Sequence, residues 1–292
     1  MFVGLDLGTS GMDNSYGHGR VNAFAAVSAA LAGIGTLEGT VRAAGGEPVA
    51  DRRERQQEEP GEHEDGERTP AASVARGEER GSGIAHAIDR EAIAKNLVGG
   101  QSRVVHAACY PSQFGCTDDV VKYDYNPAKA KELLAKAGYP DGFEIDFYGY
   151  RDRPYGEAMV GYLREVGIKA NMKWLKYSAL RDKTQADQVA LVMNTWGSYG
   201  VNDISNITGQ HFRFEYNDFA RDQQVTDWLN AGDNSIDTAY RKEVYNKALQ
   251  RIAEQAYWLP LFTWVANYAY AKNLDFTPYP DAVPRFFLSK WQ

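Results

Sequence analysis

The chain carries too little positive charge for a nucleic-acid-binding surface. It has 32 Lys and Arg against 39 Asp and Glu, which gives a formal net charge of -7. Affinity for nucleic acids depends on neutralising phosphates with Lys and Arg. The charge balance therefore argues against a nucleic acid as partner.

Long apolar runs and a leader sequence are also missing. No stretch approaches the roughly 18 to 20 apolar residues that span a bilayer. The start, MFVGLDLGTSGMD, has no basic region and no apolar core followed by a small-residue cleavage site. The sequence therefore predicts a soluble chain that carries no export signal.

Histidines are few and lie far apart along the chain. None of the five belongs to an HExxH motif or pairs with another at helical spacing, so the sequence predicts no metal site. No Ser, His and Asp combination has support either, and we expect neither a cofactor nor catalysis. The five are His18, His63, His86, His106 and His211.

Cysteine is scarce, with only Cys109 and Cys116 in HAACYPSQFGCTDD. Pro111 and Gly115 favour a turn that would bring the two sulfur atoms together as a surface disulfide. The alternative is two free thiols in a reducing compartment. A zinc site is less favoured, because no second cysteine or histidine pair lies nearby to complete four ligands.

The composition divides the chain near residue 83. The first forty residues are rich in Gly and Ala, with a short helix predicted at 21–34. Residues 43–83 are densely charged and nearly free of large apolar side chains, which predicts disorder because little apolar surface can be buried. We therefore expect a largely disordered extension over residues 1–83 and a folded domain from Ile84 onward.

Two helices are well marked in the folded part. In AIDREAIAKNLVGG, the spacing of Ile88, Ile93 and Leu97 predicts one apolar helix face that ends at a glycine pair. A second helix begins after Asn126, with a proline at its first position, and ends at Gly138.

Strand and helix patterns then alternate as in an α/β protein with a mixed sheet flanked by helices. A strand, a helix and a second strand form a β-α-β unit with parallel pairing, and the apolar run VALVMNT predicts a central strand. The predicted elements are strands 143–150, 168–174 and 189–195, helices 155–166, 219–230 and 237–256, and an aromatic strand pair at 257–271.

Several segments, in this order, resemble the family 5 solute-binding proteins of ABC importers. They are AIDREAIAKNLVGG, YDYNPAKAKELLAKAGYPDGF, WGSYGVNDISNI and EQAYWLPLFTWVANYAYAKNL. The resemblance implies one lobe of a type II periplasmic-binding-protein-like fold over residues 84–257. It also implies that residues 258–292 return towards a first domain that this chain lacks.

The same resemblance implies a function in transport. The chain would be a truncated substrate-binding component for peptides or related small polar solutes, and not an enzyme. Its partners would be that solute and the ABC permease subunits in the membrane, and its location periplasmic or otherwise extracytoplasmic. We expect it to be a monomer.

The N-terminus resembles two other families. MFVGLDLGTSG is similar to the opening of carbohydrate kinases with the actin-like ATPase fold, where Asp6, Thr9 and Ser10 would approach phosphates. DNSYGHGRVNAFAAVSAAL is similar to the last helix of subtilisin-like proteases. The alternatives to solute binding are therefore a fragment of a sugar-kinase-like ATPase and a folding remnant that binds no ligand.

The loop after the central strand holds the candidate ligand-binding residues, because ligands of open α/β sheets lie at the carboxyl ends of strands. Asp203 would accept hydrogen bonds from a cationic group of the ligand, or else cap the loop backbone. Trp196 and Tyr199 would stack on the ligand, or else belong to the core. Ser198 and Asn202 are further polar contacts.

A polar turn follows the strand predicted at 143–150. Arg151, Asp152 and Arg153 would line the edge of the same cleft, or else form a solvated turn.

Overall fold

The computed structural model describes residues 2–5, 70–198, 200–279 and 283–292. The short helix predicted at 21–34 and most of the N-terminal segments that resemble kinases and proteases lie outside these ranges. The α-helices are α2 (Pro70–Ala87), α3 (Arg90–Ile93), α4 (Pro127–Lys136), α5 (Arg153–Glu165), α6 (Tyr177–Gln185), α7 (Ser205–His211), α8 (Gln223–Asp233) and α9 (Thr238–Glu254). The strands are β1 (Phe2–Leu5), β2 (Glu144–Gly149), β3 (Lys169–Trp174), β4 (Leu191–Asn194), β5 (Trp258–Pro260), β6 (Leu274–Asp275) and β7 (Lys290–Trp291).

The five-stranded sheet has the order β3-β2-β4-β1-β5. Strand β2 pairs in parallel with both β3 and β4, whereas β1 runs antiparallel to β4 and β5. The predicted β-α-β unit is confirmed, since α5 connects β2 to β3. The predicted central strand is also confirmed as β4.

Strand β1 corrects the predicted N-terminal boundary. Leu5 pairs with Leu191 of β4, and Phe2 pairs with Pro260 of β5, so the first residues form the strand between β4 and the edge strand β5. Helix α2 also starts at Pro70, well before Ile84. The sequence did not reveal this arrangement, because the strands that β1 joins lie about two hundred residues further along the chain.

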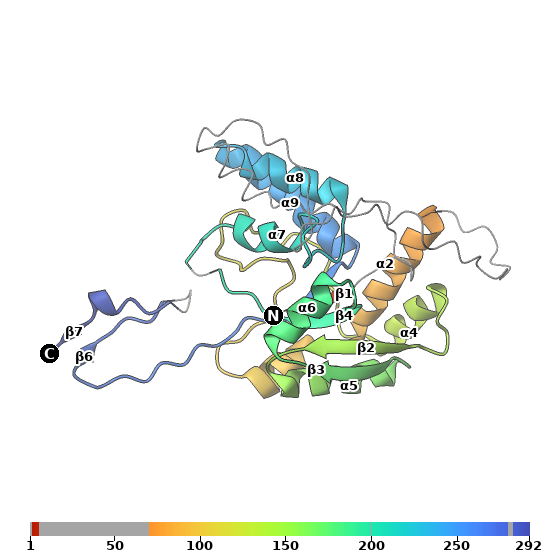
Figure 1. Cartoon of the computed structure of the whole chain (residues 1–292), viewed down its shortest axis with the longest axis horizontal. Helices are drawn as coiled ribbons and strands as arrows, with labels where there is room; N and C mark the ends of the chain where they lie inside the picture. The colour runs from red at the N-terminus through yellow and green to blue at the C-terminus, as the bar shows by residue number, and fades with distance from the viewer. Residues whose placement is uncertain (1, 6–69, 199, 280–282) are drawn as a thin grey trace, which may run out of the picture. The chain divides into compact units, whose positions relative to one another are not determined.

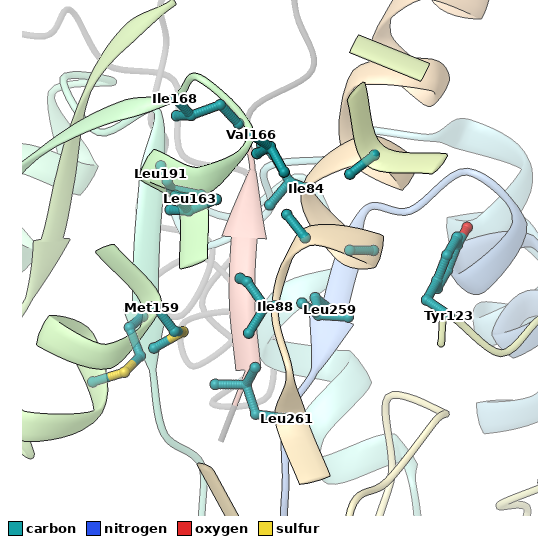
Figure 2. Close-up of a cluster of buried hydrophobic side chains, with 14 of the residues drawn as sticks. Ile84, Ile88, Tyr123, Met159, Leu163, Val166, Ile168, Leu191, Leu259 and Leu261 are labelled. Atoms are coloured by element: carbon teal, nitrogen blue, oxygen red, sulfur yellow. The ribbon is translucent and has the colours of Figure 1, made fainter. Parts of the chain in front are cut away.

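The main core lies where α2, α3 and α5 pack on the sheet around β1 (Figure 2). Ile88 comes from the link between α2 and α3, Leu163 comes from α5, and Leu191 and Leu259 come from the strands. Each of these residues is at most 4% exposed. Burying one such side chain contributes about 1.5–3 kcal/mol. The apolar face of α2 and α3 therefore fixes the helices to the sheet.

The prediction of one apolar helix face was right for Ile93, which is buried in α3. Ile88 is buried too, but it precedes the helix cap Asp89, and Leu97 is 46% exposed. The helix widens at Ala94 into a π-helical turn, Ala94–Val98. A π turn holds more residues than an α turn, so Leu97 no longer falls on the face defined by i, i+4 spacing.

The second helix is confirmed with its predicted caps. The side chain of Asn126 accepts a hydrogen bond from the backbone N–H of Lys129 (2.9 Å), and Gly138 has φ +95°. These local interactions explain why the helix could be recognised from the sequence.

A second cluster joins α7, α8, α9 and the loop at residues 107–116. Helices α8 and α9 lie side by side (Figure 1) and bury Leu229, Tyr245 and Leu249 between them and their neighbours. No helix of the described residues is long and apolar enough to cross a membrane.

The predicted aromatic strand pair at 257–271 was wrong in its second half. Only Trp258–Pro260 forms a strand, β5, at the edge of the sheet. Pro260 has no N–H to extend the ladder, and residues 261–271 carry no strand beyond an isolated bridge at Phe262.

Candidate functional site

A cavity of about 560 Å³ opens at the carboxyl ends of β2 and β4, and it is the larger of two cavities that share Thr195, Trp196 and Trp264 in their walls. Tyr150 directly follows β2, and Thr195 directly follows β4. The two side chains meet in a hydrogen bond of 2.7 Å between Tyr150 Oη and Thr195 Oγ1. From β2 the chain continues to β3 on one side of the pair, and from β4 it continues to β5 on the other side. This edge is therefore a topological switch point, where α/β proteins bind ligands.

Aromatic rings make up much of the cavity wall. Such rings offer apolar area for stacking, and the tyrosines also offer hydroxyl groups for hydrogen bonds. The rings belong to Tyr150, Tyr177, Trp196, Tyr216, Phe219 and Trp264. Polar side chains between them are those of Arg151, Arg181, Thr184, Asn194, Thr195 and Asn217. The wall is therefore suited to a small solute with both apolar and polar groups.

Helix α6 contributes one face to this wall, through Tyr177, Leu180, Arg181 and Thr184. These residues recur at i, i+3, i+4 and i+7, the spacing of one helical face. The sequence pattern did not indicate α6 (Tyr177–Gln185), because Leu180 is the only large aliphatic side chain in YSALRDKTQ. The spacing of Leu180 and Thr184 was the one available signal.

His211 lies under the cavity at the end of α7. Its ring makes edge contacts with Trp196 and Trp258, at centroid distances of 5.4 and 4.7 Å. Burial lowers the pKa of His211 to about 4, although a hydrogen bond with the backbone of Asn217 acts in the opposite direction. The imidazole is therefore neutral at physiological pH.

This buried histidine should make the protein acid-sensitive. The folded-state pKa of about 4 lies below the ordinary 6.5, so the unfolded chain binds more protons between these values. Stability is then present above about pH 6.5 and is lost as the pH falls towards 4. Between pH 7.5 and 5 we expect the wild type to lose about 2 kcal/mol more unfolding free energy than a His211→Phe variant.

Urea unfolding of both proteins at each pH measures this difference. Phe keeps the ring between the two tryptophans but cannot titrate, so the two proteins differ in the proton-binding group. Equal losses of stability in the two proteins would contradict the assignment.

Trp196 and Ser198, two of the predicted ligand-binding residues, line the cavities. Trp196 lines both, and its indole N–H donates a hydrogen bond to Asn206 Oδ1 (2.9 Å). Ser198 lines a smaller neighbouring cavity of about 120 Å³, where its hydroxyl accepts a hydrogen bond from Gln113 Nε2 (2.6 Å). Tyr199 lies outside the described residues.

Asn202 and Asp203 line neither of these cavities. Asp203 forms an ion pair with Arg241 (2.7 Å), and its other oxygen accepts the backbone N–H of Ser205 (2.9 Å). The carbonyl of Asn202 accepts the N–H of Phe114 (3.1 Å). Both residues thus hold the loop in place, and the role of Asp203 corresponds to the loop-capping alternative.

Arg241 connects Asp203 to the second cluster. Its guanidinium also bonds to the hydroxyl of Tyr245 (2.9 Å), which in turn donates to Asp233 (2.7 Å). The ring of Phe114 lies 4.7 Å from the guanidinium carbon. Nothing in the local sequence of α9 signalled that Arg241 would pair with a loop 38 residues earlier.

The structure joins Cys109 and Cys116 in a disulfide, with Cα atoms 5.7 Å apart. Cys109 lines the smaller cavity. Between the two cysteines, Gln113 accepts the N–H of Tyr110 through its side-chain oxygen (2.8 Å). The disulfide therefore closes a compact loop against the smaller cavity. Among the described residues, no group of His, Cys, Asp and Glu is placed to hold a metal ion.

Two roles were predicted for the polar turn after β2, lining the cleft edge or forming a solvated turn, and its two arginines differ in which one they take. Arg151 lines the larger cavity, as one alternative proposed, and its guanidinium lies 4.4 Å from the ring centre of Trp264. Arg153 instead pairs with Glu157 on the exposed face of α5 (2.8 Å).

The sheet order and the cavity at its carboxyl edge define one lobe of a type II periplasmic-binding-protein-like fold. The dipeptide binding protein from Pseudoalteromonas, crystallised with Met-Leu, superposes with a TM-score of 0.65 at 18% identity. The match covers 77% of this chain and 46% of that chain. The predicted fold class is confirmed.

Sequence comparisons give a similarity to the family that the sequence resembles. Residues 82–213 match the model for bacterial extracellular solute-binding proteins, family 5 Middle. Heme-binding protein A of Haemophilus influenzae is 25% identical over 194 residues, which are 60% of this chain and 34% of that protein. Glutathione-binding protein GsiB of Escherichia coli is 25% identical over 204 residues, which are 65% of this chain and 40% of that protein.

The chain therefore spans well under half the length of these curated relatives. Both relatives are named as binding proteins. The sugar-kinase alternative gains no support from these comparisons.

Proposed function

We propose that this chain is the solute-binding lobe of an ABC importer for peptides or related small polar solutes. The observation that carries the proposal is the aromatic and polar cavity at the carboxyl ends of β2 and β4. Its position on the sheet is where α/β proteins bind ligands. The relatives named above bind heme, glutathione and a dipeptide, which supports a solute of similar size.

In this role the chain binds its solute outside the cytoplasmic membrane and passes it unchanged to the permease subunits. A closed cleft needs a second wall, because binding sites normally enclose most of a ligand's surface. Ligand contacts on both walls would favour closure by a hinge motion. The protein acts as a monomer and takes no nucleic acid.

Within the cleft, Trp196, Ser198 and Tyr199 contact the solute, whereas Asn202 and Asp203 hold the loop that carries them. Residues 258–292 form the segment that returns towards the first domain. Large apolar side chains near its end support this assignment, since Phe286, Phe287 and Trp291 are 69%, 83% and 71% exposed.

Titration with di- and tripeptides tests the proposal, with tryptophan fluorescence as the signal. We expect a saturable change, because Trp196 and Trp264 line the larger cavity. Replacing Trp196 with Ala should weaken binding about tenfold through the loss of stacking area.

Trp291→Ala is the matched control, because Trp291 is exposed and lines neither cavity. It should leave the affinity unchanged. The proposal is contradicted if no peptide changes the fluorescence, or if the two variants bind equally well.

A further inference from the structure

The disulfide loop, residues 109–116, and the candidate ligand-binding loop, residues 196–206, both contribute to the wall of the smaller cavity. Cys109 and Gln113 line it from the disulfide loop. Trp196 and Ser198 line it from the ligand-binding loop, and Trp196 also lines the larger cavity. The relative position of the two loops therefore affects the walls of both cavities.

Hydrogen bonds connect the two loops directly. The side chain of Gln113, a residue that is 8% exposed, donates from Nε2 to Ser198 Oγ (2.6 Å). The N–H of Phe114 donates to the carbonyl of Asn202 (3.1 Å), and the N–H of Ile204 donates to the carbonyl of Phe114 (3.1 Å). The ligand-binding loop is therefore held in position by two neighbouring residues that the disulfide encloses.

The first half of the disulfide loop has few other contacts that would keep it in place. Residues 110–112 are exposed, and the turn is closed by the bond from the N–H of Gln113 to the carbonyl of Tyr110 (2.9 Å). Segments with few buried contacts open locally at little cost in free energy, and a covalent link across them restricts this opening. By contrast, Gly115 packs against the ring of Tyr245, where an added Cβ would lie 2.5 Å from a ring carbon.

The disulfide is also the one place where a dithiol can react, because the sequence contains no further cysteine. Cys116 is half-buried and Cys109 is 6% exposed, so a thiolate of the dithiol attacks the sulfur of Cys116 and Cys109 leaves as a thiolate. The second thiolate of the dithiol then attacks its own sulfur in the mixed disulfide, and Cys116 leaves. The dithiol becomes a disulfide, the protein gains two electrons, and each cysteine takes up a proton.

We propose that the Cys109–Cys116 disulfide is a redox-sensitive support for the ligand-binding loop. In the oxidised form it keeps Gln113 against Ser198, and the cavity wall is in place. Reduction by a dithiol releases residues 110–113, so the ligand-binding loop loses this support and the solute binds more weakly. Gln113 is a positioning residue, because it acts through Ser198. This inference rests on the proposed function and adds regulation at the same site.

Peptide titrations of the oxidised and the reduced full chain test the inference, with Ala-Phe and Ala-Phe-Ala as probes and dithiothreitol as the dithiol. We expect reduction to raise the Kd about tenfold, because binding must then also order the released segment. The double variant Cys109→Ser and Cys116→Ser should bind like the reduced wild type with or without dithiothreitol. An unchanged Kd on reduction of the wild type, or a response of the double variant to dithiothreitol, would overturn the proposal.

Hydrogen exchange distinguishes release of the loop from general unfolding, and it needs no ligand. Reduction should speed exchange of the Phe114 and Val201 amides about tenfold, because their acceptors, the carbonyls of Asn202 and Ser198, belong to the ligand-binding loop. The amide of Lys169, which lies in the sheet, should exchange as before. Equal acceleration of all three amides would mean general unfolding and would overturn the proposal.

A Gln113→Met variant tests whether the support acts through Gln113. It should bind the peptides about as weakly as the reduced wild type, and reduction should add little, because both changes remove the same support. Gln224→Met is the matched control, since Gln224 is exposed on α8 and lines neither cavity, and it should respond to dithiothreitol like the wild type. A further loss of about tenfold on reduction of Gln113→Met would overturn the role of Gln113.

The outcomes separate this inference from the proposed function. If neither peptide binds either redox form, the proposed function and the effect on affinity are both rejected. If the peptides bind but exchange of the Phe114 and Val201 amides is unchanged by reduction, the redox-sensitive support is rejected and solute binding stands.

Discussion

Replacing Arg90 with Met should destabilise the protein by about 3 to 4 kcal/mol. The Arg90 side chain is buried, with the residue only 4% exposed, and its guanidinium donates to three backbone carbonyls. These belong to Val105 (3.1 Å), Tyr123 (2.7 Å) and Pro260 (2.6 Å). Burial lowers the pKa of Arg90 to about 10, so the group remains charged at neutral pH.

Methionine fills a similar volume but donates no hydrogen bond. Each carbonyl left unpaired in the interior costs about 1–3 kcal/mol, and part of this is offset because a buried charge is also removed. Val105 and Pro260 line the smaller cavity, so any folded variant should also have an altered site.

Urea unfolding followed by circular dichroism measures the effect. Arg164→Met is the control, because this arginine is exposed and its replacement should change stability by no more than about 0.5 kcal/mol. A loss below about 1 kcal/mol for Arg90→Met would show that the three hydrogen bonds contribute little.

Replacing Gly142 with Ala should cost roughly 4 kcal/mol or more. Gly142 has φ +80°, and an added Cβ would lie 2.0 Å from the carbonyl oxygen of Gly167. The obstacle is backbone, which cannot rotate away as a flexible side chain can. The two glycines cross where β2 and β3 begin their parallel pairing, next to the bond from Lys169 N to Phe143 O (2.8 Å).

Gly138→Ala is the matched control for backbone conformation. Gly138 also has a positive φ, +95°, but an added Cβ would meet nothing within 4 Å. Its replacement should therefore cost only about 1–2 kcal/mol, the strain of the backbone alone. Thermal unfolding of both variants measures the difference, and equal losses would show that the close approach to Gly167 has no energetic consequence.

The predicted ligand-binding loop illustrates how a site can be located without its chemistry being known. The loop could be placed because a buried strand precedes it, and strand ends in α/β sheets bind ligands. Which of its side chains face the cavity depends on packing against distant elements. Trp196 reaches the cavity, whereas Asp203 is held by Arg241 of α9.

Features that arise within a few residues were predictable from the chain alone. Asn126 and Gly138 bound a helix through hydrogen bonds and backbone angles that involve only their immediate neighbours. Ile93 falls on the buried face of α3 for the same local reason, and the alternating pattern of 143–150 predicted β2.

Other features arise only when distant segments pack together. Arg90 meets a carbonyl 170 residues away, and strand β1 joins two strands from the second half of the chain. Neither pairing leaves a periodic or local signal, because the partners become neighbours only through the fold. The residue types of the cavity wall were therefore visible in the sequence, but their meeting at one edge of the sheet follows from the packing of α6, β2 and β4.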